Sequence, residues 1–228
     1  MRYELRGKRL LDVGVGGGRT TPYLIEISRD YVGIDYSPQM VEQSRKRHPG
    51  VEFRVCDVRD LSQFGDGSFE FVFFSFNGID YIGPDDRIGA LCEIYRVLSN
   101  GGAFAFSSHN RNAPRRAAWS PAHLPLNINP LRKPQSFAFQ LVRYPLGIFN
   151  RLVNRRHERQ TGAYELRNDE ALEYSLITYY IHVADQVRQL EEARFQDCRA
   201  IDLSGRWLEA GDFPNARDHW IYYLCRRG

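Results

Sequence analysis

Short apolar runs alternate with amphipathic stretches along the first half of the chain. Apolar runs that suit buried strands occupy residues 9–15, 31–35, 51–57, 69–76 and 103–108. Between these runs, apolar residues recur every three or four positions, as in helices, over residues 21–29, 37–48 and 84–102. Strands that alternate with helices predict βαβ units, which build a parallel sheet with helices on both of its faces.

The alternation lapses after residue 108 and resumes near residue 182. Several prolines interrupt the segment 109–181, in which residues 146–156 suit an amphipathic helix and residues 161–181 suit two strands around Asn168 and Asp169. The chain then offers a helix and two strands, at residues 183–195, 196–203 and 219–227. We therefore predict one domain with a lid-like insert that covers the substrate. The domain comprises residues 1–108 and 182–228, and the insert comprises residues 109–181.

Charge also sets the insert apart. The chain carries a net charge of +3, yet residues 108–160 hold ten basic residues and one acidic residue, so the remainder is net acidic. Four interpretations stay open: a solvated face of the lid, a site for an acidic small molecule, contact with an anionic membrane surface, and contact with RNA. The modest net charge and the irregular spacing of aromatic residues make nucleic acid the least favoured partner.

Other features bound the class of protein. No apolar stretch reaches the roughly 18 residues of a membrane-spanning helix, and the first residues lack the pattern of a secretion signal. The four cysteines lie far apart, so the sequence suggests neither a disulfide framework nor a zinc site, and we expect no metal. These features favour a cytoplasmic protein of unknown oligomeric state.

The stretch "RLLDVGVGGGRTTPYL" joins the first strand to the first helix, with Thr21 as the expected N-cap. Glycines let a ligand lie against backbone N–H groups at such a turn. The dinucleotide pattern G-x-G-x-x-G fails because Arg19 stands where its third glycine belongs, and the lysine of a phosphate-binding loop is absent. What remains is an acid followed by alternating glycines: Asp12, Gly14, Gly16 and Gly18.

This pattern resembles the first motif of class I S-adenosylmethionine-dependent methyltransferases. The resemblance continues at Asp35, where the family places an acid that binds both ribose hydroxyls, and at Tyr36 and Met40, which it places around the adenine. In "CDVRDL" it implies that Asp57 binds the adenine amino group and that Val58 offers its backbone N–H.

The resemblance also implies the fold and the remaining cofactor contacts. It implies a doubly wound, Rossmann-like, mostly parallel sheet of seven strands whose last strand is antiparallel. The cofactor is S-adenosylmethionine, and Phe74 and Ser75 lie near its methionine end together with Asn77. Arg19, beside the last loop glycine, belongs to the same candidate set.

The acceptor is expected beyond the fourth and fifth strands, where His109 and Asn77 are the candidate catalytic residues. His109 suits a base that takes a proton from an amine or a hydroxyl, and its alternative role is purely structural at the strand end. The run "SFNG" is similar to that of small-molecule N-methyltransferases, and the Asp/Asn-Pro-Pro-Tyr motif of nucleobase and glutamine methyltransferases is absent. Nitrogen is therefore preferred slightly to oxygen as the methylated atom.

One departure from the family leaves a second function open. The family usually has one or two helices before the first strand, whereas only about seven residues precede it here. Either the insert covers the cofactor, or the natural start lies upstream, or binding is weaker. The alternative function is a non-catalytic module that binds an anionic partner or membrane surface through the arginine-rich insert. A dehydrogenase is a distant third, disfavoured by Arg19.

Overall fold

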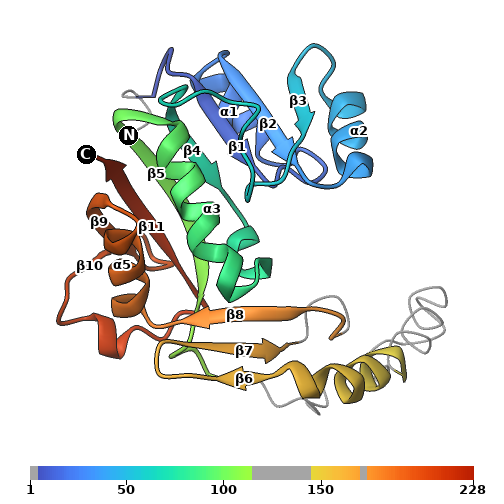
Figure 1. The fold of residues 1–228 in the computed structure, drawn as a ribbon, viewed down its shortest axis with the longest axis vertical. Helices are drawn as coiled ribbons and strands as arrows, with labels where there is room; N and C mark the ends of the chain where they lie inside the picture. Colours follow the sequence, from blue (N-terminus) through green and yellow to red (C-terminus); the bar gives the residue numbers. More distant parts are fainter. Residues whose placement is uncertain (1–4, 115–144, 170–173) are drawn as a thin grey trace.

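A mostly parallel sheet forms the centre of the computed structural model, which describes residues 5–114, 145–169 and 174–228 (Figure 1). Seven of its strands follow the order β3-β2-β1-β4-β5-β11-β9. Their bounds are β1 (Leu10–Val13), β2 (Tyr31–Asp35), β3 (Glu52–Val55), β4 (Phe69–Phe74), β5 (Leu98–Asn110), β9 (Phe195–Ile201) and β11 (Trp220–Arg227). Only β11 runs against its neighbours in this group, β5 and β9. The predicted Rossmann-like arrangement with an antiparallel last strand is confirmed.

Four more strands enlarge the sheet beyond the predicted seven. The short β10 (Trp207–Leu208) pairs with β9. The insert adds β6 (Arg159–Gln160), β7 (Tyr164–Asn168) and β8 (Ile177–Ile181), which pair antiparallel in that order. They join the main sheet because β5 continues to Asn110, past its predicted end at residue 108, and its last two residues pair in parallel with β8.

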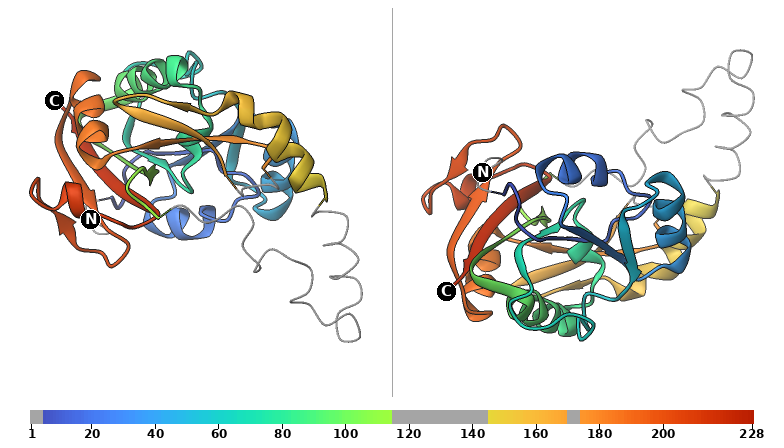
Figure 2. Two further views of the ribbon diagram at one scale, coloured as in Figure 1. Left: turned by 90° about the horizontal axis from the view of Figure 1, so that it is seen from below. Right: turned by 90° about the horizontal axis from the view of Figure 1, so that it is seen from above.

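Helices cover both faces of the sheet (Figures 1 and 2). One face packs against α1 (Thr21–Ile27) and α2 (Pro38–Arg47), whose Leu24 and Val41 belong to one buried cluster. The other face packs against α3 (Pro84–Val97) and α5 (Val183–Glu192), which bury Leu91, Ile94 and Leu190 in a second, larger cluster. Short 3₁₀ turns complete the described chain: η1 (Gly78–Tyr81), η4 (Arg155–His157) and η5 (Phe213–Asn215).

Two helix boundaries differ from the sequence prediction. The N-cap of α1 is Thr20 rather than Thr21, and its hydroxyl donates to Asp12 instead of capping the helix. The helix α3 ends at Val97, not at the glycines near residue 102. The chain becomes a strand there because Leu98 pairs with Phe69 on β4 and buries its side chain completely.

The described part of the insert forms an arm beside the carboxyl ends of the strands (Figure 1). Residues 145–154 are helical, as predicted for residues 146–156, and β7 and β8 are the two strands predicted within residues 161–181. Five of the ten basic residues within residues 108–160 lie outside the described residues: Arg115, Arg116, Arg132, Lys133 and Arg143. Among the described helices, none has the length and apolar character needed to cross a membrane.

The unpaired hydroxyl of Tyr223 in the core offers a test of the packing. Tyr223 on β11 stacks on Phe106 at 5.1 Å between ring centroids, and no described residue gives its buried hydroxyl a hydrogen bond. We expect Tyr223→Phe to raise the free energy of unfolding by about 1 kcal/mol, because an unpaired buried polar group is costly. Urea denaturation measures this change.

Tyr31→Phe is the matched control. The hydroxyl of Tyr31 donates to Asp12 at 2.8 Å, so this substitution should instead lower the free energy of unfolding by about 1–3 kcal/mol. Equal destabilisation by the two substitutions would contradict the assignment.

Candidate active site

The glycine loop after β1 is held in place by α2. Ser44 donates its hydroxyl to the carbonyl of Gly16 at 2.8 Å, Arg47 donates to that of Gly17, and the His48 ring contacts that of Gly18 at 2.9 Å. These bonds occupy the loop carbonyls, while the N–H groups of Gly14 and Gly18 donate to the carbonyls of Ile34 and Val15. The conformation of the loop is therefore fixed by its own backbone and by α2. Ser44, Arg47 and His48 lie three and four positions apart on α2 and at its C-cap, a spacing that marks one helix face.

Two of the glycines are needed for different reasons. At Gly18 the backbone is left-handed, with φ of +74°, and a Cβ would lie 2.8 Å from the His48 ring. At Gly16, with φ of +53°, a Cβ would meet no atom within 4 Å. Close packing thus requires Gly18, whereas Gly16 borders open space in which a ligand fits against the backbone.

Asp35 stands at the end of β2 and faces this loop. Its two carboxylate oxygens each accept one backbone N–H at 2.9 Å, one from Gly16 and one from Ser37. Each oxygen keeps a further lone pair, so the carboxylate can still accept from two hydroxyls. This pair of acceptors fits the ribose diol of S-adenosylmethionine, as the sequence resemblance implies.

Asp12 lies deeper in the fold than the glycine loop and binds Thr20, which follows the loop in the chain. The side chain is fully buried, and one of its oxygens accepts from Thr20 at 2.7 Å and from Tyr31 at 2.8 Å. The other oxygen, Oδ1, has no partner among the described residues. Burial raises the pKa of Asp12 from 3.8 to about 6, against the lowering effect of the two hydroxyl donors.

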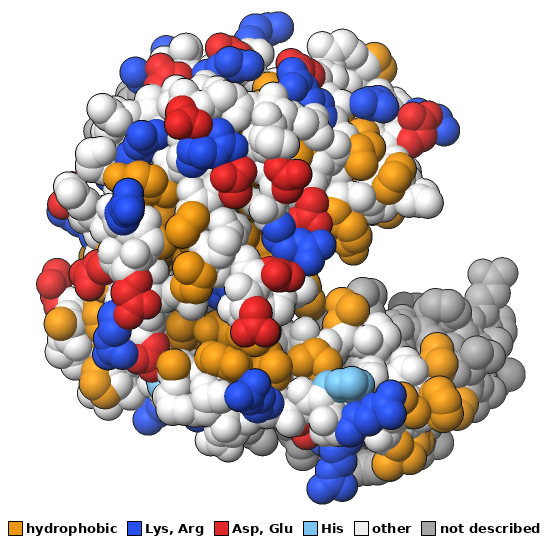
Figure 3. All heavy atoms as spheres, viewed as in Figure 1, with side chains coloured by type: hydrophobic (Ala, Val, Ile, Leu, Met, Phe, Trp, Pro, Cys, Tyr) orange, Lys and Arg blue, Asp and Glu red, His pale blue; other side chains and the backbone are white. Residues whose placement is uncertain are grey.

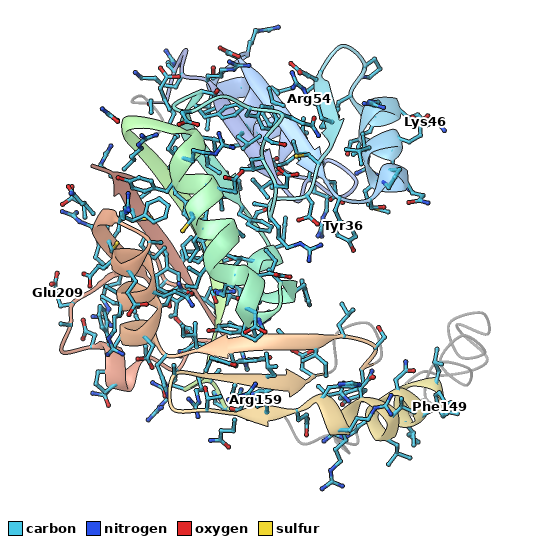
Figure 4. The ribbon with its side chains drawn as sticks, viewed as in Figure 1. Tyr36, Lys46, Arg54, Phe149, Arg159 and Glu209 are labelled. Carbon is cyan, nitrogen blue, oxygen red and sulfur yellow. The ribbon has the colours of Figure 1, made fainter. Side chains whose placement is uncertain are left out.

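The predicted adenine-side residues occupy the ends of β2 and β3. Tyr36 is 77% exposed and faces the open side of the molecule between the sheet and the arm (Figure 4), and Met40 is half-buried on α2. Val58 is buried. Asp57 is bound by Arg59 at 2.7 Å, and hydrogen bonding from that guanidinium lowers its pKa. Asp57 is therefore not free in this arrangement, and its role toward adenine stays a prediction.

A left-handed turn follows β4. Phe74 is buried, Ser75 is half-buried, and Phe76 and Asn77 adopt φ values of 54° and 55°, which non-glycine residues seldom take. Ser107 on β5 fixes the turn by accepting the Asn77 backbone N–H at 3.0 Å. Such strained backbone is frequent at binding and catalytic sites.

Arg19 links the glycine loop to this turn. Its guanidinium lies over the ring of Phe76, 4.2 Å from the ring centroid. The side chain that excludes the dinucleotide pattern therefore bridges two segments of the candidate site, a contact that the sequence alone did not reveal.

His109 is paired with a buried carboxylate. Its ring nitrogen Nδ1 lies 2.8 Å from Oδ2 of Asp80, which also accepts the His109 backbone N–H at 2.6 Å. The other ring nitrogen, Nε2, lies 3.3 Å from the Asn77 amide nitrogen. A proton on Nδ1 satisfies Asp80, and the Nε2 lone pair then accepts from the Asn77 amide. An acceptor molecule whose proton goes to Nε2 therefore takes the place of the Asn77 N–H. His109 lies within β5. The sequence analysis had placed it just after the end of that strand.

Asp80 was not predicted, and neither was the residue that neutralises it. Arg87 on α3 is fully buried and bonds Asp80 at 2.9 Å. The same guanidinium donates to Gln186 at 2.7 Å and to Gln189 at 3.0 Å, both on α5. One signal in the sequence marks Arg87: it occupies the apolar stripe of α3, four residues before Leu91 and seven before Ile94.

The insert contributes an aromatic wall to this region. The ring of Tyr180 on β8 lies 4.9 Å from that of His109, and its hydroxyl donates to Asp169 at 2.8 Å. Tyr81 from η1 is 45% exposed.

Figure 3 shows the molecule hollowed between the sheet and the arm, on the side where the parallel strands end. Asn77, His109 and the glycine loop therefore lie at the same edge of the sheet, where its parallel strands end.

A comparison with protein families identifies the part of the chain that carries this site. Residues 11–106 match the model described as "Methyltransferase domain". These residues are similar to a methyltransferase domain. The matched segment includes the glycine loop, Asp35, Asp57, Asp80 and Arg87, whereas His109 lies just beyond its end.

Curated relatives resemble a little less than half of the chain. A demethylmenaquinone methyltransferase of Beutenbergia cavernae is 35% identical over 42% of this chain and 38% of its own length. A ubiquinone biosynthesis O-methyltransferase of Xanthomonas oryzae is 31% identical over 48% of this chain and 46% of its own. The matched region thus spans less than half the length of these relatives.

Solved structures share the fold over nearly the whole chain. An S-adenosylmethionine-dependent methyltransferase of Mesorhizobium loti covers 98% of this chain and 93% of its own, at 18% identity and a TM-score of 0.65. A 1,6-didemethyltoxoflavin-N1-methyltransferase of Burkholderia thailandensis, solved with its substrate and S-adenosylhomocysteine, covers 97% of this chain and 72% of its own. Its identity is 17% and its TM-score is 0.57. Both confirm the fold expected for an S-adenosylmethionine-dependent methyltransferase.

The burial of Asp12 predicts a pH-dependent stability. Because its folded pKa of about 6 exceeds the usual 3.8, its contribution to stability is full below about pH 3.8 and is lost as the pH rises through 6. Relative to Asp12→Asn, the wild type should therefore gain up to about 3 kcal/mol as the pH falls from about 7 to about 4. Urea denaturation of both proteins across this range measures the difference. A difference that stays constant with pH would contradict the assigned burial.

Proposed function

We propose that the chain transfers a methyl group from S-adenosylmethionine to a small molecule, and that His109 accepts the proton that the acceptor loses. The Asp80–His109 pair carries this proposal. The turn after β4 connects this pair to the glycine loop. Asn77 in the turn contacts His109, and its neighbour Phe76 contacts Arg19 of the loop.

The cofactor supplies a methyl group on a positively charged sulfur, which leaves as a neutral thioether when a nucleophile attacks in line. Asp35 would bind the ribose, with the nucleoside in the open space beside Gly16, and the residues of the turn at Asn77 would contact the methionine end. Proximity and alignment provide most of the acceleration in such a displacement. The residues need only place the acceptor and remove its proton.

The pairing of His109 bears on the identity of the attacking atom. A neutral amine attacks with its own lone pair, whereas a hydroxyl is a poor nucleophile until its proton is removed. Asp80 orients the imidazole and stabilises the imidazolium that forms when Nε2 takes the proton. We therefore favour a hydroxyl acceptor. The preference for nitrogen that the sequence suggested rests on the "SFNG" run alone and has no comparable support.

The second function, a non-catalytic binding module, needs no oriented base. The fully buried ion pair of Asp80 and Arg87, which holds His109 through Asp80, supports the catalytic role over that alternative.

Asp35→Ala tests the cofactor site. Loss of a charged acceptor costs about 1.5–3 kcal/mol, which corresponds to a roughly 10- to 100-fold weaker affinity for S-adenosylhomocysteine. Isothermal titration measures it, and Glu42→Ala, an exposed substitution on α2, is the control with unchanged affinity. An affinity unchanged by Asp35→Ala, or no binding by the wild type at millimolar ligand, would refute the assignment.

His109→Ala tests the base. With acceptors found by screening phenols and amines for release of S-adenosylhomocysteine, we expect the rate to fall about 10²- to 10⁴-fold while cofactor affinity is retained. For a phenol, the lost rate should return as the pH rises, because the acceptor then ionises by itself.

His219→Ala, which changes an exposed histidine before β11, is the control and should keep the wild-type rate. A full rate with His109→Ala at neutral pH would remove the residue as a base. A uniform loss without recovery at high pH would leave it only a structural part of the strand end.

A further inference from the structure

The helix of the insert presents its apolar side to solvent. Five residues form its exposed face: Pro145, Leu146, Phe149, Leu152 and Val153. At about 100° per residue they fill a continuous arc of roughly 120° that contains no polar side chain. A surface helix of a globular protein has the opposite arrangement, with its apolar side against the core.

The polar side of the same helix attaches it to the arm. Arg151 lies over the ring of Tyr174 at 5.1 Å, and Asn154 donates to the Tyr174 carbonyl at 2.9 Å. Asn168 on β7 donates to the Arg151 carbonyl at 3.2 Å. The outward direction of the apolar face is therefore fixed by specific polar contacts. Phe149 and Leu152 remain 63% and 67% exposed.

Cationic side chains continue this face at the C-terminal end of the helix. Arg155, Arg156 and Arg159 are all exposed, and no described carboxylate lies within ion-pair distance of any of them. Figure 3 shows basic and hydrophobic side chains side by side on the arm, and Figure 4 labels Phe149 toward its outer end and Arg159 nearer to the main sheet. Glu158 is the single acid between them, and it accepts the Asn168 backbone N–H at 3.3 Å.

We propose that this face, made of residues 145–153 with Arg155, Arg156 and Arg159, binds the surface of an anionic lipid bilayer. An apolar arc flanked by arginines is the arrangement of a helix that lies in the membrane interface. The apolar side chains enter the acyl boundary, and the arginines pair with anionic headgroups. Single-stranded RNA fits less well, because Leu146, Leu152 and Val153 offer bases nothing to stack on.

Vesicle flotation with the full chain tests the proposal. We expect the wild type to bind phosphatidylcholine vesicles that contain about a third phosphatidylglycerol, and to bind pure phosphatidylcholine vesicles at least tenfold less. Binding should weaken as NaCl rises from about 50 to about 500 mM, because salt screens the headgroup charge.

Two double variants separate the apolar and the charged contributions. Phe149→Ser with Leu152→Ser, and Arg155→Gln with Arg156→Gln, should each reduce partitioning about tenfold or more. Matched controls change exposed residues elsewhere and should bind like the wild type. They are Tyr23→Ser with Leu203→Ser, and Lys46→Gln with Arg188→Gln. Affinity for S-adenosylhomocysteine, measured separately, shows that each variant is folded and keeps the cofactor question apart from the lipid question.

Several outcomes would overturn the proposal. These are no binding of the wild type to anionic vesicles, equal binding to neutral ones, and full binding by either double variant. Binding of a short single-stranded RNA in place of vesicles, abolished by the arginine substitutions, would also overturn it and would assign the face to nucleic acid.

Discussion

The buried ion pair between Asp80 and Arg87 is the constraint on which the site depends. Both side chains are completely inaccessible to solvent, so neither charge is tolerable without the other. Asp80 comes from the turn after β4 and Arg87 from α3. Ser108 on β5 bonds both side chains, and Gln186 on α5 accepts from Arg87. A single charge pair thus joins four elements behind the edge of the sheet. Removal of either partner would strand the other in the core, at a cost of about 3–5 kcal/mol.

The same pair connects stability to chemistry. Asp80 accepts both the backbone N–H and the ring Nδ1 of His109, so the imidazole has a fixed orientation before any ligand arrives. On the other side of the site, the loop carbonyls are bound by α2 and Asp35 is bound by two backbone N–H groups. The site is therefore organised by hydrogen bonds of the protein itself, which is the condition for aligning two reactants.

The sequence predicted those features of the structure that depend on residues close together in the chain. The order of strands and helices, the glycine loop and the acids at successive strand ends all have local signals, and the structure confirms the elements. The antiparallel β11 followed only from the family resemblance. Arg87 lies 99 residues from Gln186, and β8 pairs with β5 across the insert. Because the partners lie far apart in the sequence, no local pattern predicts either contact. The partner of His109 was missed for the same reason: Asp80 lies 29 residues earlier, beyond a helix.

The position of β11 has a consequence for how the molecule forms. This strand lies between β5 and β9, although it is made after both of them. Until residues 220–227 leave the ribosome, β5 and β9 each keep an open edge of unpaired N–H and C=O groups next to apolar side chains. Such an edge attracts strands of other molecules. The nascent chain is thus most prone to aggregate just before its sheet closes, and synthesis slowed at that point would lengthen the exposure.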